Sequence, residues 1–360
     1  MNNYKTVFFA IGVLLIILGA FMLIPFFIQF IYGEKNSTFL SSASVTAFIG
    51  ILLVLTNLEE SRKLNLQQAF LLTTLSWLSI AIFGCIPFLL SDLNLSFVDS
   101  FFESMSGITT TGSTIITYLD NAPKSILIWR AILQWLGGIG VIVMAITILP
   151  LLNVGGMQLF RMENSDTTEK ILPRTREVTL IISLIYLALT LACGIAYWLT
   201  GMNIFDSIAH SMTTIATGGF STYSSSIGYF QSPKIEIISI IFIILGSIPF
   251  ITYLKFVKSD KKIFLKDKQI KGLVYILIIS ILLMFLYLLL SNKEHSFSEN
   301  LRISTFNVVS ILSGTGYVTS DFSMWGKFPL IFFLFLMFIG GCAGSTTCGI
   351  KIFRFQILGS

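Results

Sequence analysis

Charged residues are scarce in this sequence. Only 11% of its 360 residues are Asp, Glu, Lys or Arg, whereas 54% are hydrophobic and the mean hydropathy is +0.86. A soluble domain carries roughly 25% charged residues. The scarcity of charge therefore excludes an ordinary soluble protein and indicates a chain that lives in a lipid bilayer.

Histidine and cysteine are also rare, which narrows the possible chemistry. His210 and His295 lie far apart, and no cluster of acids and bases falls inside an apolar run. A membrane-embedded enzyme needs such groups gathered at membrane depth, so we do not expect an enzyme or an organic cofactor. The cysteines form no CxxC pair, which argues against a zinc site or a disulfide framework and favours packing roles. They are Cys85, Cys193, Cys342 and Cys348.

Long apolar runs are what the sequence has instead. A helix needs about 20 apolar residues to cross about 30 Å of hydrocarbon. Eight runs are long enough: 6–33, 36–58, 64–91, 131–160, 178–205, 237–254, 272–292 and 328–350. They predict an all-α polytopic membrane protein. The first run is too long for the apolar part of a signal peptide, so we expect it to be a retained helix.

Lys and Arg are distributed unevenly between these runs. If the N-terminus is cytoplasmic, that side collects sixteen of the 23 basic residues, seven of them lysines between Lys255 and Lys271. Short basic loops stay cytoplasmic, so we predict a multi-pass plasma-membrane protein with both termini inside. The net charge of +5 then reflects topology, not nucleic-acid binding. The other nine are Lys5, Arg62, Lys63, Arg161, Lys170, Arg174, Arg176, Lys351 and Arg354.

The seven remaining basic residues are assigned to the outer segments. They are Lys35, Lys124, Arg130, Lys234, Lys293, Arg302 and Lys327.

A short unit repeats between the apolar runs. Residues 99–112 match 206–219 at an offset of 107, and a third, weaker copy follows at a further offset of 97. Each unit has a spanning helix, a half-apolar segment too short to span, a Thr/Gly cluster and a second spanning helix. The clusters are TTTGST at 109–114, ATGGFST at 216–222 and SGTGYVT at 313–319. The short segments are predicted to enter the membrane and turn back.

Such a repeat favours a pore. Lipid cannot satisfy non-helical backbone, which is tolerated at membrane depth only where it is buried or lines water. Glycine lets successive carbonyls face one axis, where they replace the hydration shell of a monovalent cation. The negative end of each short helix dipole also favours cations over anions. A helix C-cap followed by an outer turn is the alternative for any single cluster.

Four acids near the clusters have two interpretations each. Asp99 and Asp206 stand in the first turn of a short helix, where offsetting the helix dipole is a simpler role than coordinating an ion. Asp120 and Asp321 follow two clusters, where they either raise the cation concentration at an outer mouth or are ordinary solvated loop acids.

These clusters resemble the filter segments of the Trk/Ktr/HKT superfamily of potassium and sodium transporters. Two further motifs carry the resemblance: WRAILQWLGGIG at 129–140 and, most specifically, GGCAGSTTCGIK at 340–351. The extra helix pair at 1–63 is similar to the Trk branch. The resemblance implies pore units at 64–176, 177–270 and 271–360, whereas the family's fourth unit is absent from this sequence.

The resemblance also implies a site for K⁺. The filter backbone is expected at Thr110, Thr111, Gly112, Thr217, Gly218, Gly219, Gly314, Thr315 and Gly316. Serine at the first glycine position is associated with sodium in this superfamily, so glycine at position 112 favours potassium. A gating loop below the filter is expected at Gly340, Gly341, Ala343, Gly344, Ser345, Thr346 and Gly349.

Two features of that loop stay open. Thr347 and Cys348 stand where smaller residues are usual in the family. A close helix-packing surface of small residues is the alternative to a gate.

The resemblance implies potassium uptake, a homodimer and a cytosolic nucleotide-binding regulatory subunit. The basic loop at 255–271 faces that partner or anionic lipid, or is simply a solvated positive loop. A non-conducting scaffold that pairs with a complete homologue is an alternative, and a secondary transporter would show paired halves instead of three like units. Three carbonyl segments leave one side of an ion site open, so we predict that this chain alone does not form a competent filter.

Overall fold

The computed structural model describes residues 4–34, 37–58, 65–147, 175–258, 262–291 and 296–359. Helices dominate these residues, and the only β-type pairing within them is an isolated bridge between Ile339 and Ile350. The chain divides into two compact units, Met1–Gly137 and Gly138–Ser360. The predicted all-α fold is confirmed.

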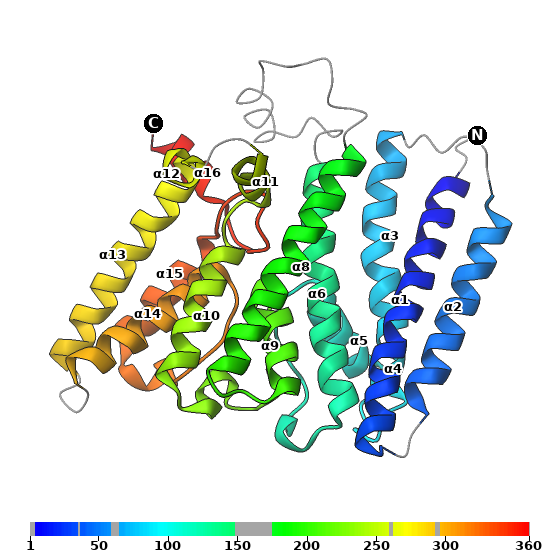
Figure 1. Ribbon diagram of the computed structural model, residues 1–360, viewed down its shortest axis with the longest axis horizontal. Coiled ribbons are helices and arrows are strands. Elements are labelled where there is room, and N and C mark those ends of the chain that lie inside the picture. Colours follow the sequence, from blue (N-terminus) through cyan, green and yellow to red (C-terminus); the bar gives the residue numbers. More distant parts are fainter. Residues whose placement is uncertain are drawn as a thin grey trace. The chain divides into compact units, whose positions relative to one another are not determined.

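The first unit is built on a helical hairpin. Helices α1 and α2 run side by side (Figure 1) and pack so closely that a Cβ on Gly12 would lie 2.7 Å from the Gly50 carbonyl oxygen. Small residues permit such an approach where the hydrophobic effect does not drive helices together. The elements are α1 (Lys5–Tyr32), α2 (Thr38–Thr56), α3 (Leu66–Gly84), α4 (Ile86–Leu89), α5 (Phe97–Ile108), η1 (Leu119–Asn121) and the first part of α6 (Lys124–Thr147).

The second unit holds the remainder of α6 and the rest of the chain. The short helix α9 packs on α8 and α10, and the short helix α14 packs on α13, α10 and α15. The elements are α8 (Thr175–Leu199), α9 (Ile204–Ile215), η5 (Ser226–Phe230), α10 (Pro233–Gly246), α11 (Phe250–Lys258), α12 (Ile263–Lys266), α13 (Lys268–Ser291), α14 (Phe297–Ser313), η6 (Phe322–Trp325), α15 (Lys327–Phe338) and α16 (Ile352–Leu358).

The described residues contain six helices long and apolar enough to cross a membrane. They correspond to six of the eight predicted runs: 6–33, 36–58, 64–91, 131–160, 178–205 and 272–292. Many large apolar side chains on these helices are exposed, as lipid-facing residues are. Several predicted features lie outside the described residues: the part of 131–160 after residue 147, the boundary at 63/64, Lys35, Arg62, Lys63, Arg161, Lys170, Arg174, Lys261, Lys293 and His295.

The other two predicted spans are not continuous helices. Run 237–254 forms α10 and α11, which meet at an angle of 86°. Pro249, directly before α11, has no N–H and disfavours helical backbone at the residue before it, so a straight helix cannot pass this point. In run 328–350, helix α15 ends at Phe338 and a Gly-rich loop, residues 339–351, follows.

Three short helices start with the same local chemistry. Ser96, Asn203 and Ser296 are the N-caps of α5, α9 and α14, and each side chain accepts a hydrogen bond from the backbone N–H three residues later. An acidic residue stands at that third position in every case. Such a cap satisfies free N–H groups, and the acid offsets the positive end of the helix dipole. Local sequence therefore fixes where each of these helices begins.

Candidate functional site

The three Thr/Gly clusters share one backbone conformation. In the first cluster, Thr110 and Gly112 have positive φ angles of 56° and 82°. The same two positions have positive φ in the second cluster, at Thr217 (48°) and Gly219 (78°). A β-branched residue with positive φ is rare and costs about 1–3 kcal/mol, which points to a functional requirement.

The third cluster follows the same pattern with glycine at both positions. Gly314 and Gly316 have φ angles of 76° and 77°. Reversal of the φ sign at alternate residues turns carbonyls, which would alternate in a regular strand, toward one side. The arrangement is therefore repeated three times within the described residues.

Most carbonyls of the predicted filter residues are left without a hydrogen-bond donor among the described residues. The carbonyl one residue after the last glycine is different: Ser113 O accepts from Ser106 Oγ at 2.5 Å, and Tyr317 O accepts from Ser310 Oγ at 2.7 Å. The carbonyls without a protein donor are those of Thr110, Thr111, Gly112, Thr217, Gly219, Gly314, Thr315 and Gly316. Thr111 and Gly316 are exposed, and the other six residues are buried or half-buried. A buried carbonyl needs a partner, and a cation that binds oxygen ligands can be that partner.

The second and third clusters are packed against each other. A Cβ on Gly219 would lie 1.7 Å from the Thr315 carbonyl oxygen, so no other residue fits there without a shift. Tyr317, which is fully buried, extends its hydroxyl into α9, 2.5 Å from Thr213 Oγ1 and 3.2 Å from Thr214 Oγ1. These contacts fix two of the predicted filter segments relative to one another.

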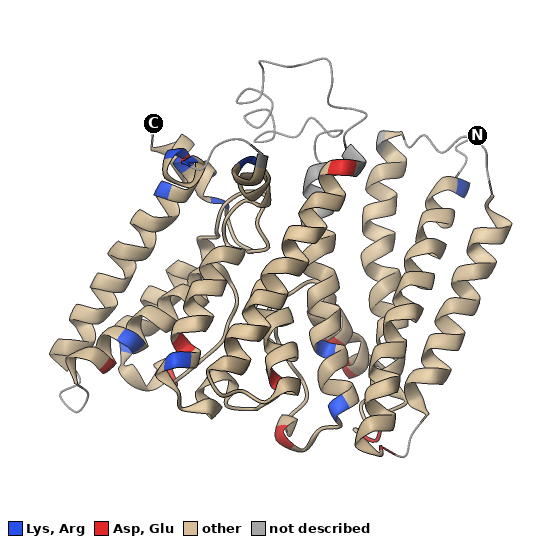
Figure 2. Ribbon diagram, viewed as in Figure 1, with Lys and Arg blue, Asp and Glu red and all other residues tan. Residues whose placement is uncertain are grey.

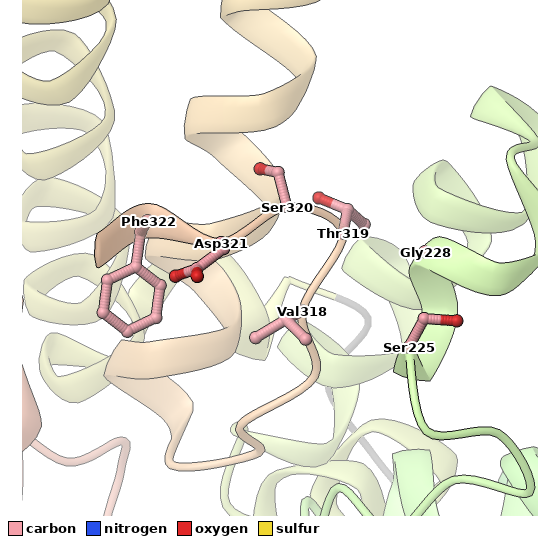
Figure 3. Close-up of a pocket in the computed structure, with 7 residues that line it drawn as sticks. All are labelled: Ser225, Gly228, Val318, Thr319, Ser320, Asp321 and Phe322. Carbon is pink, nitrogen blue, oxygen red and sulfur yellow. The ribbon is translucent and has the colours of Figure 1, made fainter. Parts of the chain in front are cut away.

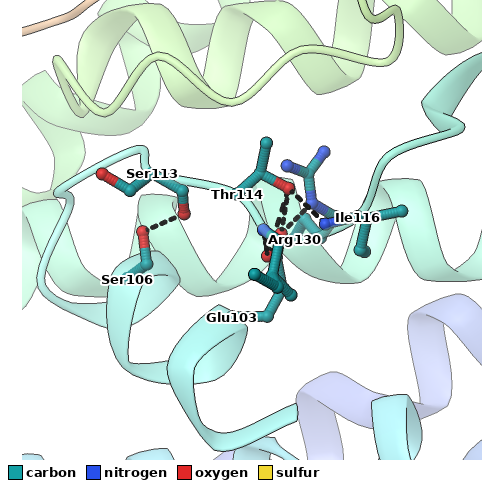
Figure 4. A network of polar contacts seen from close by, with 7 residues as sticks. Glu103, Ser106, Ser113, Thr114, Ile116 and Arg130 are labelled. Carbon is teal, nitrogen blue, oxygen red and sulfur yellow. Dashed lines mark hydrogen bonds and ion pairs between the residues drawn. The ribbon is translucent and has the colours of Figure 1, made fainter. Parts of the chain in front are cut away.

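The first cluster is held by a buried ion pair, which Figure 4 shows. Arg130 Nε donates to Glu103 Oε1 at 2.6 Å, and the two side chains are 1% and 0% exposed. Glu103 also accepts from Thr114 Oγ1, at 3.0 Å, and from the Ile115 N–H, at 2.9 Å. The assignment of Arg130 to an outer segment is therefore wrong: α6 carries it in its interior.

The Gly-rich loop is a compact, largely buried structure. Its two ends pair, because Gly340 N–H donates to Ile350 O and Ile350 N–H donates to Phe338 O, both at 2.9 Å. Gly344 and Gly349 have positive φ angles of 76° and 77°. The predicted gate residues are brought together in this loop: Gly340, Gly341, Ala343, Gly344, Ser345, Thr346 and Gly349.

Thr346 connects this loop to the second cluster. Its hydroxyl lies 3.0 Å from both the Ile215 and the Gly246 carbonyl oxygens and 3.1 Å from Thr217 Oγ1. Ile215 is the last residue of α9, and Thr217 is one of the residues with positive φ. One threonine of the loop thus contacts the inner end of a predicted filter segment.

The break between α10 and α11 receives the same loop. Helix termination frees carbonyls there, and Ser247 O accepts from Cys342 N–H at 3.2 Å. In return, Phe250 N–H donates to Gly344 O at 2.9 Å. The bend therefore has a structural role, because it supplies the polar backbone groups that hold the loop.

Cys348 does not have the packing role predicted for all four cysteines. Cys85, Cys193 and Cys342 are buried, but Cys348 is exposed. Its sulfur lies close to the third cluster, since a Cβ on Gly314 would come within 2.0 Å of Sγ.

The predicted acids have different environments. Asp206 is buried and accepts hydrogen bonds from Thr222 Oγ1 at 2.7 Å and Tyr223 OH at 2.8 Å, so it supports the chain after the second cluster. Asp99 bonds only its own helix cap at Ser96, in agreement with an acid that offsets the dipole.

A cavity of about 340 Å³ adjoins the chain after the third cluster, and Asp321 is one of its lining residues (Figure 3). Asp321 is exposed, and hydrogen bonds from Ser323 hold the pKa of its carboxyl below the ordinary value, so it is charged at neutral pH. The cavity is lined by Ser225, Gly228, Val318, Thr319, Ser320, Asp321 and Phe322.

Basic residues gather at one end of the second unit, around α11, α12, α16 and the start of α13 (Figure 2). A partly buried ion pair joins Glu236 of α10 to Arg302 of α14. The basic residues are Lys255, Lys262, Lys266, Lys268, Lys271, Lys351 and Arg354.

Several side chains of the site were not predicted from the sequence. Glu103, Arg130 and Tyr317 have no counterpart of the same residue type in the other repeats, so alignment of the repeats does not single them out. The sequence does contain a signal: Glu103 is a charged residue in a short half-apolar segment, and Arg130 directly precedes an apolar run. Charged residues in such places are buried only when paired, so an ion pair could have been predicted.

Comparison with known proteins gives consistent results. The family model TrkH, described as a cation transport protein, matches residues 34–360. The Trk system potassium uptake protein TrkI of Halomonas elongata is 38% identical over 359 residues, covering 99% of this chain and 73% of its own length. The Trk system potassium uptake protein TrkH of Escherichia coli K12 is 37% identical over 361 residues, covering 99% of this chain and 75% of its own.

A solved structure is similar in three dimensions as well. The crystal structure of the potassium transporter TrkH from Vibrio parahaemolyticus matches with a TM-score of 0.91 at 36% identity. The match covers 100% of this chain and 75% of that one.

Proposed function

Since the chain belongs to the TrkH family of cation transport proteins, we propose that it carries K⁺ across the plasma membrane through a filter of backbone carbonyls. The observation that supports this most is the positive φ at the same two positions of all three clusters. Together with the carbonyls that lack a hydrogen-bond donor among the described residues, it supports coordination of a cation by the carbonyls of each segment. The filter residues are those predicted above, from Thr110 to Gly316.

Potassium is the preferred ion in this proposal. The curated relatives are named potassium uptake proteins. Gly112 has a φ of 82°, which glycine adopts without penalty and serine does not. A larger side chain at position 112 would displace the neighbouring filter carbonyl. The distance between this carbonyl and the ion would then no longer suit K⁺.

The Gly-rich loop is the proposed gate below the filter. Its contacts with Ile215, Thr217 and Gly246 through the Thr346 hydroxyl support a gating role, because they join the loop directly to the inner end of a proposed filter segment. Residues rich in Gly, Ser and Thr are poor helix formers, so the segment can move without unfolding a helix. Packing alone is the competing role.

A filter needs a fourth side. The described residues supply three segments, and a cation that faces a void on one side lacks the coordination that offsets its dehydration. The fourth segment is proposed to come from a further polypeptide segment of the same kind. A non-conducting scaffold that pairs with a complete homologue is the second candidate function. Measurement of potassium flux distinguishes this scaffold from a conducting pore.

The proposed partners follow from the family and from charge. A second copy of the chain and a cytosolic nucleotide-binding regulatory subunit are proposed, and the relatives are named as proteins of a Trk system. The basic end of the second unit is suited to the cytoplasmic side, to such a subunit or to anionic lipid. This orientation puts both termini in the cytoplasm.

Potassium uptake is the test of this function. The chain is expressed in a bacterium that lacks its own potassium uptake, alone and together with the part of the Vibrio parahaemolyticus relative that has no counterpart here. We expect growth at low potassium and ⁸⁶Rb⁺ uptake only when a fourth segment is present. Selective uptake by the purified chain alone would show that the filter is completed between copies. No uptake with the fourth segment present, despite normal membrane yield, favours the scaffold.

A further inference from the structure

The short helices α5, α9 and α14 are called the pore helices below. At one equivalent position in each pore helix, a side chain contacts the residues that follow the filter segment. This position lies nine residues before the last glycine of each cluster and is occupied by Glu103, His210 and Asn307. All three side chains are 0% exposed. The residue types differ so much that no sequence pattern connects them, yet each makes the equivalent contact.

In the first repeat the contact is made by a carboxylate. Glu103 accepts from the Thr114 hydroxyl and from the Ile115 N–H, the second and third residues after Gly112. Arg130 neutralises this buried charge at 2.6 Å (Figure 4). A carboxylate that is buried among apolar residues requires such a partner.

In the second repeat the contact is made by an imidazole. His210 Nδ1 lies 2.9 Å from Asp206 O, which can only accept, so Nδ1 carries the proton. In the neutral ring Nε2 is then an acceptor, and Ser221 Oγ, 2.9 Å away, donates to it. Ser221 Oγ also accepts from the Tyr223 N–H at 3.1 Å, which leaves its own proton for the imidazole.

In the third repeat the contact is made by an amide and is weaker. Asn307 Nδ2 donates to Thr319 Oγ1 at 3.3 Å and to Ile303 O at 2.9 Å. Thr319 is the third residue after Gly316, whereas Ser221 is the second after Gly219. The anchor persists although its polarity is reversed.

We propose that Glu103, His210 and Asn307 are positioning residues that set ion selectivity by fixing the outer end of each filter segment. This inference rests on the proposed function. The pore helix fixes the inner end of each segment, because the cluster continues directly from its last turn. The outer end is held by these three side chains, and in the first and third segments Ser106 and Ser310 contribute as well.

A strand released at that end lets its carbonyls move inward. Carbonyls that are held apart favour the larger, more easily dehydrated K⁺, whereas carbonyls free to approach one another also coordinate the smaller Na⁺. Loss of an anchor therefore reduces discrimination before it reduces the amount of folded protein. The hydrogen bonds described above join the three side chains to the chain that follows the filter carbonyls.

The second repeat offers the sharpest test, because its anchor is neutral and has a hydroxyl partner that can be deleted alone. Ser221→Ala removes the donor to His210, and His210→Leu removes the acceptor. His210→Gln keeps a polar group near the position of Nε2 and is the conservative variant. Ser207→Ala is the matched control, since Ser207 is a buried serine of α9 whose hydroxyl bonds Asn203 O at 2.8 Å within its own helix.

The readout is the sodium to potassium permeability ratio, measured in the uptake assay described above with a fourth segment present. Both Ser221→Ala and His210→Leu remove the His210–Ser221 hydrogen bond, and its loss is expected to raise the ratio about two- to tenfold. Ser221→Ala also removes the acceptor of the Tyr223 N–H, and His210→Leu also removes the bond to Asp206 O, so the hydrogen bond that both variants lose is the one between His210 and Ser221. His210→Gln should recover at least part of the selectivity, and Ser207→Ala should leave it unchanged.

The outcomes separate this inference from the function on which it rests. If the unmodified chain shows no selective potassium uptake, the proposed function fails and the anchor role fails with it. If the unmodified chain is selective and Ser221→Ala keeps the same ratio, the positioning role alone is overturned, even where the yield of His210→Leu falls. A ratio that changes as much in Ser207→Ala as in Ser221→Ala also overturns it, because the effect would then reflect general loosening of α9.

Discussion

The first and second pore segments are held by different chemistry at the same structural position. The first uses a fully buried ion pair between Glu103 and Arg130, and the second uses a neutral hydrogen bond between His210 and Ser221. Deleting one member of a buried ion pair leaves an uncompensated charge, whereas deleting one side of a neutral bond leaves only an unpaired polar group. The comparison teaches that one position of a repeat can have different roles in different copies. In the first copy it mainly stabilises the fold, and in the second it mainly sets the geometry of the filter segment.

The largest effect is expected where the ion pair is broken. Arg130→Met leaves the Glu103 carboxylate buried without a counter-charge, which destabilises a protein by about 3–5 kcal/mol. We expect a large fall in the thermal midpoint of the detergent-solubilised protein. The midpoint is measured by size-exclusion chromatography of samples heated to increasing temperatures. The double variant E103Q/R130M removes both charges and should recover part of the loss.

Arg302→Met is the control for that prediction. Arg302 forms another ion pair, with Glu236, but its side chain is 23% exposed. Water and salt weaken such a pair, so its loss should lower the midpoint less. Equal losses in the two variants would contradict the role given to burial.

A second prediction compares two glycines of the packed clusters. Gly219→Ala places a Cβ 1.7 Å from the Thr315 carbonyl oxygen, and Gly316→Ala meets no atom within 4 Å. Both residues have positive φ, so alanine costs each about 1–2 kcal/mol of backbone strain and only Gly219 adds a clash. Gly219→Ala is expected to abolish ⁸⁶Rb⁺ uptake while Gly316→Ala retains part of it. The reverse order would show that strain, not the contact between the two clusters, governs the filter.

The third prediction extends the comparison to the first segment. Gly112→Ser requires serine to adopt a φ of 82° in a filter strand, at a strain of about 1–2 kcal/mol. It should erode the preference for potassium over sodium more than it lowers protein yield. Relative permeability in liposomes tests this with a fourth segment supplied, and an unchanged ratio removes Gly112 from the filter.

The smallest effect is expected at the loop. Thr346→Val keeps the side-chain volume but removes the hydroxyl that reaches Ile215 O, Gly246 O and Thr217 Oγ1. A net loss of about 1 kcal/mol per hydrogen bond should favour displacement of the loop and raise flux about fivefold at constant selectivity. Shortening the loop between Gly340 and Gly349 should act in the same direction. Lower stability with unaltered flux would instead support a packing role.

Composition and pattern were enough to predict much of the fold. Six of eight apolar runs are spanning helices, and the family suggested by the motifs is confirmed. The two departures have local physical causes: Pro249 interrupts one helix, and the Gly-rich run ends the other. The loop was expected from the motif, but the 86° bend that holds it was not, because a single proline in an apolar run does not say how far a helix turns.

The sequence by itself determined the solvent, the helices and the position of the clusters. Hydropathy, capping residues and glycines act over a few neighbouring residues, so they can be read along the chain. Only the tertiary structure decided what holds each cluster, because Glu103 meets Arg130 across 27 residues and Thr346 meets Ile215 across 131. Such contacts depend on which buried polar group finds a partner in three dimensions, and glutamate, histidine and asparagine each meet that need without any shared pattern in the sequence.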